Sequence, residues 1–362
     1  MASSYSKMSI KSPIEAVQQV AEPMSARASV GTWCELFKAR LTTLVLLTTA
    51  VGYWFANHES ALGSGFWLAL VGTGLLAAGA AALNQYWERA SDALMQRTAS
   101  RPIPSGAIEP ALALAVGVVL SMVGMLELTF LVNPLTGLLG MLTLASYVFV
   151  YTPLKRRTTL NTLVGAVPGA LPPLMGWTAA TGEFGTGGWV LFTILFFWQL
   201  PHFMAIAWLY REDYARAGFR MLPVEDETGL RTGATAVRHT VALIAFSLAP
   251  VALGLAGRWY AAFAVVGGFA FLGCAIVFAS HLSRQSARRL FFASILYLPM
   301  ILGALVADKA KQVTPLATRQ TVMAARQRLP FEQASISTPS ASSSSPESRT
   351  KQPRFEFLNT TP

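Results

Sequence analysis

Nine apolar runs occupy most of the chain between residues 41 and 307, separated by short polar connections. A helix needs about 20 residues to cross a hydrocarbon core of about 30 Å, which is close to the length of these runs. With 53% hydrophobic and 13% charged residues and a mean hydropathy of +0.46, the 362-residue chain is predicted to be an integral membrane protein. We expect an all-α fold of about nine transmembrane helices. The predicted spans are residues 41–56, 66–87, 111–132, 135–151, 160–180, 189–210, 237–256, 259–281 and 290–307.

Polar tails flank the predicted membrane domain, residues 33–307. Residues 1–32 carry acids among the bases and no apolar run ahead of a cleavage site, so they do not read as a secretory signal peptide. Residues 308–362 include the tract STPSASSSSPES, a composition that cannot bury a core and that predicts disorder.

The basic residues predict an orientation. Most of the 28 lysines and arginines lie in the N-terminal segment and in alternate connections, whereas the opposite connections contain only Arg258. Because cytoplasmic loops are enriched in Lys and Arg, the N-terminus is expected inside and the C-terminal tail outside. The N-terminal composition favours a bacterial plasma (inner) membrane, with the mitochondrial inner membrane as the alternative.

The segment NQYWERASDALMQRTASRPIPSG, residues 84–106, carries the chemistry that stands out most. Asn84, Glu88 and Asp92 are spaced by four residues, so on a helix they share one face. Carboxylate and amide oxygens suit Mg²⁺, which is usually held by one or two carboxylates together with a substrate's phosphates. Arg97 and Arg101 follow, and guanidinium groups can grip the oxygens of a diphosphate. A wet helix end at the membrane surface is the simpler explanation for any one of these charges.

A second acidic segment lies in the connection after the sixth predicted span, YREDYARAGFRMLPVEDE. Glu212 and Asp213 follow that span directly, with arginines and a proline after them, as in the first segment. The two segments could therefore face each other across one cavity and hold a diphosphate between them. Residues 225–227, Glu-Asp-Glu, are interpreted as a solvated loop face.

The other polar residues each allow a structural or a functional interpretation. Gln199 and His202 share a face within the sixth predicted span, and a histidine in a span is more often a hydrogen-bonded core residue than a ligand. Lys155 and Arg156, in the loop YTPLKRR, either enforce topology or close over phosphates.

The chain resembles the UbiA-type membrane prenyltransferases, and within them the protoheme IX farnesyltransferase (heme O synthase) group. The resemblance covers about residues 33–307 and rests on the segment 84–106, on YTPLKRRTTLNTLVGAVPGALPPLMGW and on WQLPHFMAIAWLYREDYARAGFRMLP. Quinone-type members usually have aspartates where this chain has Gln85 and Glu88, and this departure resembles the heme O synthase version. The second acidic motif of the superfamily is reduced here to Glu212 and Asp213.

The resemblance implies a fold, a reaction and a site. Nine helices would surround a central cavity, and farnesyl diphosphate would transfer its farnesyl group to a vinyl group of heme b, with water addition, to give heme O for terminal oxidases. Membrane lipid, a downstream heme A synthase and oxidase assembly factors are the further partners expected, and no nucleic acid. The cofactor would be Mg²⁺, bound by Asn84, Glu88, Asp92 and Asp213, and the catalytic set would consist of these four residues and Glu212. Diphosphate binding would fall to Lys38, Arg97, Arg101, Lys155 and Arg156.

His202 is predicted to serve the heme, because it lies about 15 Å deeper than Glu212 on a continuous helix, too far for a shared metal site. Gln199 is expected to fix the imidazole tautomer. Two other functions remain open. An enzyme that prenylates a quinone precursor or chlorophyllide would share every diphosphate argument. A transporter is disfavoured because its site would lie near the bilayer midplane, whereas these acids lie at the inner surface.

Overall fold

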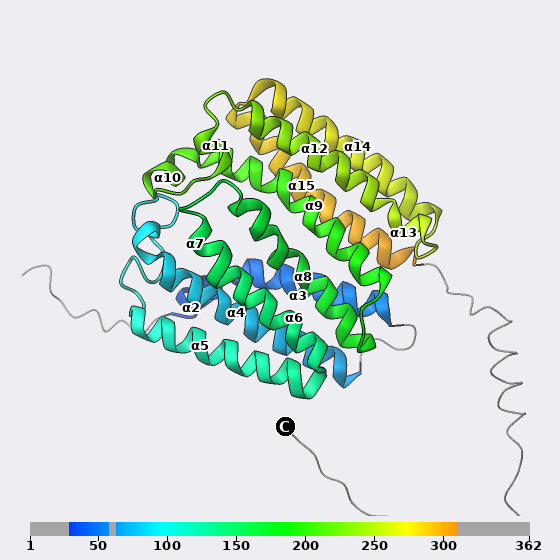
Figure 1. Cartoon of the computed structure of the whole chain (residues 1–362), viewed down its shortest axis with the longest axis horizontal. Coiled ribbons are helices and arrows are strands. Elements are labelled where there is room, and N and C mark those ends of the chain that lie inside the picture. Colours follow the sequence, from blue (N-terminus) through cyan, green and yellow to red (C-terminus); the bar gives the residue numbers. More distant parts are fainter. Residues whose placement is uncertain (1–28, 58–62, 310–362) are drawn as a thin grey trace, which may run out of the picture. The chain divides into compact units, whose positions relative to one another are not determined.

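The computed structural model describes residues 29–57 and 63–309, so most of both predicted tails lies outside the described residues. The chain divides into two units after Lys311, and the second unit, residues 312–362, falls wholly outside them. In the first unit the described secondary structure is helical, apart from one isolated bridge between Ala256 and Lys309 (Figure 1). The elements are α2 (Val30–Leu36), α3 (Ala39–Ala56), α4 (Ser64–Asp92), α5 (Pro110–Glu127), η1 (Leu128–Val132), α6 (Pro134–Ala145), η2 (Ser146–Tyr151), α7 (Thr152–Leu154), α8 (Asn161–Thr181), α9 (Thr186–Leu209), α10 (Arg211–Arg216), α11 (Leu222–Glu225), α12 (Leu230–Ser247), α13 (Ala249–Ala252), α14 (Arg258–His281) and α15 (Arg284–Ala307).

Long helices occupy all nine ranges predicted as spans. Among the described residues, eight helical stretches are long and apolar enough to cross a membrane. The ninth long helix, α8, has 21 residues and contains Pro168, Pro172 and Pro173, which lower its hydropathy. Because α8 packs against α3, α6 and α9, neighbouring helices rather than lipid surround much of it. The prediction of an all-α membrane fold with about nine long helices is therefore confirmed.

The contact between α3 and α8 depends on glycines at close backbone approaches. A Cβ atom at Gly176 would collide with the carbonyl oxygen of Thr49, and one at Gly52 would collide with that of Pro173. Small residues let helices approach closely in membranes, where dispersion contacts and interhelical hydrogen bonds stabilise the packing. These close approaches hold α8 directly against α3.

Helix α9 is the central packing element of the later half of the fold. It contacts α8 on one side and α12 and α15 on the others, as Figure 1 also shows. The indole Nε1 of Trp198 donates a hydrogen bond of 2.8 Å to the carbonyl oxygen of Ser294 on α15. Polar groups at membrane depth are thus satisfied inside the protein, as a span requires.

The predicted solvated face at residues 225–227 is wrong for Asp226. This carboxylate is 5% exposed and accepts hydrogen bonds from the backbone N–H of Thr232, at 2.7 Å, and from its hydroxyl, at 2.8 Å. Thr232 lies in the first turn of α12, where backbone N–H groups lack helical partners. Asp226 therefore caps α12, whereas Glu227 is exposed as expected.

Candidate functional site

The predicted oxygen face lies at the C-terminal end of α4. Asn84 and Asp92 are fully buried and Glu88 is 6% exposed. The spacing of four residues places them on one side of the helix, and each meets a cationic side chain from another part of the chain. The common face predicted from the sequence is confirmed.

Three cations contact these oxygens. The Lys155 ammonium donates to Glu88 Oε1 at 2.6 Å, and Arg101 Nη1 lies 2.8 Å from both carboxylate oxygens of Asp92. The Lys38 ammonium donates to Asn84 Oδ1 at 2.6 Å. These side chains come from the start of α3, from the loop after α4 and from the loop after α7, so four separate segments meet here. Each of the three side chains on α4 therefore lies beside a cationic group, and the site brings acidic and basic groups together.

Lys38 occupies an unusual position. Its backbone is left-handed at φ 48°, a conformation uncommon for a residue with a side chain, and it precedes the first turn of α3. The ammonium also lies 3.2 Å from the Tyr147 hydroxyl. Burial, and then the positive charge of Arg101, lower the pKa of Lys38 to about 7. A bound anion would offset both effects, so the site favours a negatively charged ligand next to Lys38.

The pKa of Lys155 is shifted in the opposite direction from that of Lys38. Burial alone would lower its pKa, but the Glu88 carboxylate beside it and the nearby Tyr151 and Tyr147 outweigh burial and raise the pKa above its usual value. The ammonium also lies 4.6 Å from the centre of the Tyr151 ring, a cation–π distance. Lys155 therefore keeps its charge inside the site.

The second acidic segment meets the first. Asp213, at the start of α10, is buried, accepts a 3.3 Å hydrogen bond from the backbone N–H of Gln96 and pairs with Arg216. Glu212 is exposed and lines a polar pocket of about 350 Å³ that also includes Arg97. The two segments, four spans apart in the sequence, are thus in contact.

Two predicted phosphate ligands have other partners in this structure. The Arg97 guanidinium lies over the ring of Tyr210, 4.9 Å from its centre, and donates to the Tyr214 hydroxyl at 3.3 Å. Arg156 donates to the hydroxyl of Ser91, which precedes Asp92 in the sequence. Both lie at the edge of the site, and their role toward phosphate stays a prediction.

Residues not singled out for the site hold its parts together. Thr152 accepts a 3.0 Å hydrogen bond from the Asn84 amide, which fixes the amide oxygen toward Lys38. Tyr147 and Tyr151 precede Lys155 by two helical turns and one turn, a spacing that could have marked them as partners of its ammonium. Gln85 instead donates to the carbonyl oxygens of Glu35 and Leu36, so it ties α2 to α4.

His202 lies away from the acids and faces α15. Its Nδ1 is 2.7 Å from the Ser294 hydroxyl, and its ring stacks between Trp198 and Phe291. Gln199 donates to the carbonyl oxygens of Ala166 and Leu195, so the partner of the imidazole is Ser294, not Gln199. A heme role for His202 and Gln199 stays a prediction.

The donor set fits a hard cation that is completed by its substrate. Among residues 29–57 and 63–309, no group of three or more His, Cys, Asp or Glu side chains forms a metal cage. Two carboxylates and one amide oxygen on α4 are the kind of partial ligand set that suits Mg²⁺ when phosphate oxygens supply the rest. Asp213 lies on the adjoining segment, and its role as a further metal ligand stays a prediction.

Comparison with known proteins identifies the family. The profile of the UbiA prenyltransferase family matches residues 45–296. The chain is 46% identical over 290 residues to a protoheme IX farnesyltransferase of Solibacter usitatus (strain Ellin6076), covering 76% of this chain and 98% of that protein. It is 47% identical over 278 residues to a protoheme IX farnesyltransferase of Myxococcus xanthus (strain DK1622), covering 76% and 93%.

Solved structures agree on the fold. A structure described for digeranylgeranylglyceryl phosphate synthase matches with a TM-score of 0.66 at 16% identity, covering 77% of this chain and 98% of that chain. A UbiA homologue from Aeropyrum pernix K1 matches with a TM-score of 0.60 at 22% identity, covering 74% and 96%. Profile, sequence relatives and fold together place the chain in the UbiA prenyltransferase family.

Proposed function

We propose that this protein is a Mg²⁺-dependent membrane farnesyltransferase that transfers the farnesyl group of farnesyl diphosphate to a vinyl group of heme b. Water adds in the same reaction, and the product is heme O. The support is the similarity of at least 40% identity, over most of the chain, to proteins named protoheme IX farnesyltransferase. The observation that carries the proposal is the buried face of α4, on which two carboxylates and an amide oxygen each meet a cation.

Binding of the diphosphate would exchange ion-pair partners within this site. Asn84, Glu88, Asp92 and Asp213 would hold Mg²⁺, which when bound with the diphosphate neutralises the negative charge that grows as the C–O bond breaks. Lys155 and Arg101 then turn from the carboxylates to phosphate oxygens. Because these groups are already positioned in an enclosed site, little reorganisation is needed as the charge develops.

The proposed reaction needs no nucleophile from the protein. The bond between farnesyl C1 and the diphosphate oxygen breaks, and C1 bonds to the terminal carbon of the heme vinyl group. The cation left on the adjacent carbon takes up water and releases a proton, which leaves a hydroxyl group. Tyr147 and Tyr151, next to Lys155, present π faces that stabilise positive charge near the breaking bond.

The protein crosses the membrane several times, and we place the diphosphate site on the cytoplasmic side of a bacterial plasma membrane. The basis is the concentration of basic residues in the connections that form the site. A mitochondrial inner membrane would present the same asymmetry from the matrix side. Downstream proteins that convert heme O or receive it are the partners expected from this activity.

Product analysis tests the proposed function. Purified protein in detergent, given farnesyl diphosphate, heme b and Mg²⁺, should yield heme whose mass has increased by one farnesyl group plus water, with diphosphate released in equal amount. Chelation of Mg²⁺ should stop both. Turnover of a quinone precursor or chlorophyllide, and not of heme b, would show that the acceptor is a different molecule. The absence of any diphosphate release would favour a transporter.

A further inference from the structure

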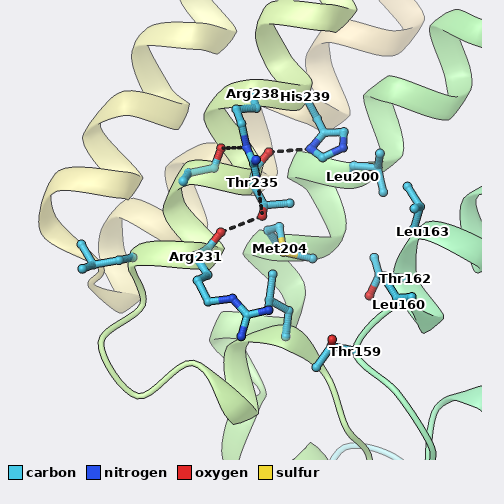
Figure 2. A pocket seen from close by; sticks show the side chains of 13 residues that line it. Thr159, Leu160, Thr162, Leu163, Leu200, Met204, Arg231, Thr235, Arg238 and His239 are labelled. Carbon is cyan, nitrogen blue, oxygen red and sulfur yellow. Dashed lines mark hydrogen bonds between the residues drawn. The ribbon is translucent and has the colours of Figure 1, made fainter.

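A second cavity, of about 500 Å³, lies between α8, α9, α11 and α12 and shares no residue with the diphosphate site (Figure 2). Much of its wall is apolar, including Leu163 from α8, Leu200 and Met204 from α9, and Leu222 from α11. A cavity of this size, apolar with a few placed polar groups, is typical of a small-molecule site. The polar groups come mainly from α12.

One face of α12 supplies the charged lining. Arg231, Thr235, Arg238 and His239 follow the spacing of a single helical face and line the cavity together. Arg231 lies in the first turn of the helix, and His239 lies eight residues further along, about 12 Å deeper. A ligand that fills the cavity would therefore meet a cation at the membrane surface and an imidazole within the span.

The imidazole of His239 has a defined orientation. Its Nδ1 lies 2.7 Å from the Thr235 carbonyl oxygen, and because a carbonyl can only accept, the hydrogen of the neutral ring is on Nδ1. Nε2 is then the unprotonated nitrogen, and Figure 2 shows the ring next to Leu200 on the cavity side of α12. A carbonyl bound to one ring nitrogen is the arrangement that orients a histidine whose other nitrogen binds a metal.

The two arginines leave positive charge at the cavity. Within residues 29–57 and 63–309, neither Arg231 nor Arg238 forms an ion pair. Arg238 is held along its own helix by the Ala234 carbonyl and the Thr235 hydroxyl, at 3.3 and 3.4 Å. Two guanidinium groups without carboxylate partners match a ligand that carries two carboxylates.

A short segment of the chain connects the lining of the cavity with the diphosphate site. Leu160 and Thr162, which line the cavity, follow Lys155 along one short segment. The Arg220 backbone N–H donates to the Lys155 carbonyl oxygen at 2.7 Å, and the Asn161 amide donates to the Arg220 carbonyl oxygen at 2.8 Å. A ligand in the cavity would therefore contact the segment that follows Lys155 in the sequence.

We propose that this cavity receives heme b, with its propionates on Arg231 and Arg238, its iron on Nε2 of His239 and its ring on the apolar wall. The assignment rests on the proposed function, which requires a tetrapyrrole acceptor next to the farnesyl donor. A phospholipid could use the arginines and the apolar wall, but it has no use for an oriented imidazole. His202 lies on a different face of α9 from Leu200 and Met204, so one heme does not contact both histidines.

Heme titration of the full-length protein in detergent, without farnesyl diphosphate, tests the assignment. His239→Ala should shift the Soret band of the bound heme and weaken heme affinity about 10-fold or more, the usual cost of disturbing a metal ligand's environment. The double variant Arg231→Gln/Arg238→Gln should weaken heme affinity about 10-fold, as expected when charge-assisted hydrogen bonds are lost. Both variants should bind farnesyl diphosphate as the wild type does.

His281→Ala is the matched control. His281 makes the same Nδ1 contact to a carbonyl four residues earlier, at 3.1 Å to Val277, but it is exposed on α14 and does not line the cavity. Heme affinity and the Soret band should not change in this variant. Thermal unfolding of each variant in the same detergent verifies that the fold is kept.

Three outcomes would overturn the assignment. An unchanged Soret band and heme affinity in folded His239→Ala would exclude a bond between the heme iron and His239. Unchanged heme affinity in the double arginine variant would exclude contacts between the propionates and the two arginines. Loss of a co-purified phospholipid from the arginine variant, with heme affinity intact, would make the cavity a lipid site. Heme O formation by the wild type is measured separately by mass, so a failure of the proposed function is recognised independently of the heme titration.

Discussion

The Lys155 ammonium lies 2.6 Å from Glu88 Oε1, and both side chains are nearly enclosed, with 11% and 6% of their surfaces exposed. The two residues are 67 positions apart in the sequence. Removing one member of a buried ion pair leaves an unpaired charge and typically costs about 3–5 kcal/mol, whereas replacing both can be nearly neutral. Single and double variants of this pair can therefore separate its contribution to stability from its contribution to catalysis.

Lys155→Met should lower the free energy of unfolding by about 3 kcal/mol, because it strands the Glu88 carboxylate. The double variant Lys155→Met/Glu88→Gln should regain most of that stability but none of the activity, since both phosphate-binding and metal-binding groups are lost. Thermal unfolding in detergent and diphosphate release measure the two properties. A double variant as unstable as the single one would mean that the pair is not the source of the loss.

Asp92→Asn should reduce turnover by about 100-fold or more while the protein stays folded and membrane-inserted, because the amide no longer offers a charged ligand to the cation. Arg101 would keep a hydrogen-bond acceptor in the variant. Diphosphate release at a series of Mg²⁺ concentrations is the measurement. Glu35→Gln, an exposed acid at the same end of the bundle, is the control and should be neutral. Wild-type turnover at limiting Mg²⁺ would exclude Asp92 as a metal ligand.

The lowered pKa of Lys38, about 7, predicts a pH-dependent affinity for the diphosphate. A bound diphosphate favours the charged lysine and raises its pKa, so binding takes up a proton when the free protein has lost it. Affinity should therefore be highest below pH 7 and should fall as the pH rises through about 7 to 9. Lys38→Arg, which stays charged, should flatten this fall in equilibrium binding experiments without heme. Equal pH profiles for the wild type and the variant would contradict the assignment.

The helices and the oxygen face could be predicted because both depend on local patterns. Run length and the spacing of Asn84, Glu88 and Asp92 are read directly from the sequence, and the structure places all three on one buried face. Whether α8 spans the membrane is harder to judge from the sequence, because its three prolines lower its hydropathy. Their effect is reduced in the fold, where α3, α6 and α9 pack around the helix.

Partners from distant segments could not be predicted in the same way. Gln199 lies three residues from His202, yet Ser294 on α15 contacts the imidazole and the Ala166 carbonyl takes the Gln199 amide. Asp226 looked like one acid in a solvated run, but the chain folds back so that its carboxylate caps α12. Such partners depend on how helices cross, which spacing within one segment does not encode.

Membrane topology gives a prediction that does not depend on catalysis. Since basic residues concentrate in alternate connections, a reporter fused after Ala307 should be translocated, whereas one inserted between Arg220 and Arg231 should stay inside. Paired reporters active on opposite sides of the membrane measure this in cells. A fusion after Ala307 found inside would mean that one of the nine long helices does not cross.

His202 provides the comparison between the prediction made from the sequence and the cavity proposal. If His202 is structural, His202→Ala should lower the free energy of unfolding by about 1–3 kcal/mol, because it removes the buried hydrogen bond to Ser294, whose hydroxyl then keeps only its bond to the Phe291 carbonyl oxygen. Ser294→Ala removes the same hydrogen bond but keeps the imidazole. This variant should also have a lower free energy of unfolding, and its use of heme should not change. Thermal unfolding, heme titration and farnesyl diphosphate binding should be measured for both variants and for His239→Ala. Selective loss of heme affinity in folded His202→Ala, with none in His239→Ala, would restore the original prediction and reject the cavity between α8 and α12 as the heme site.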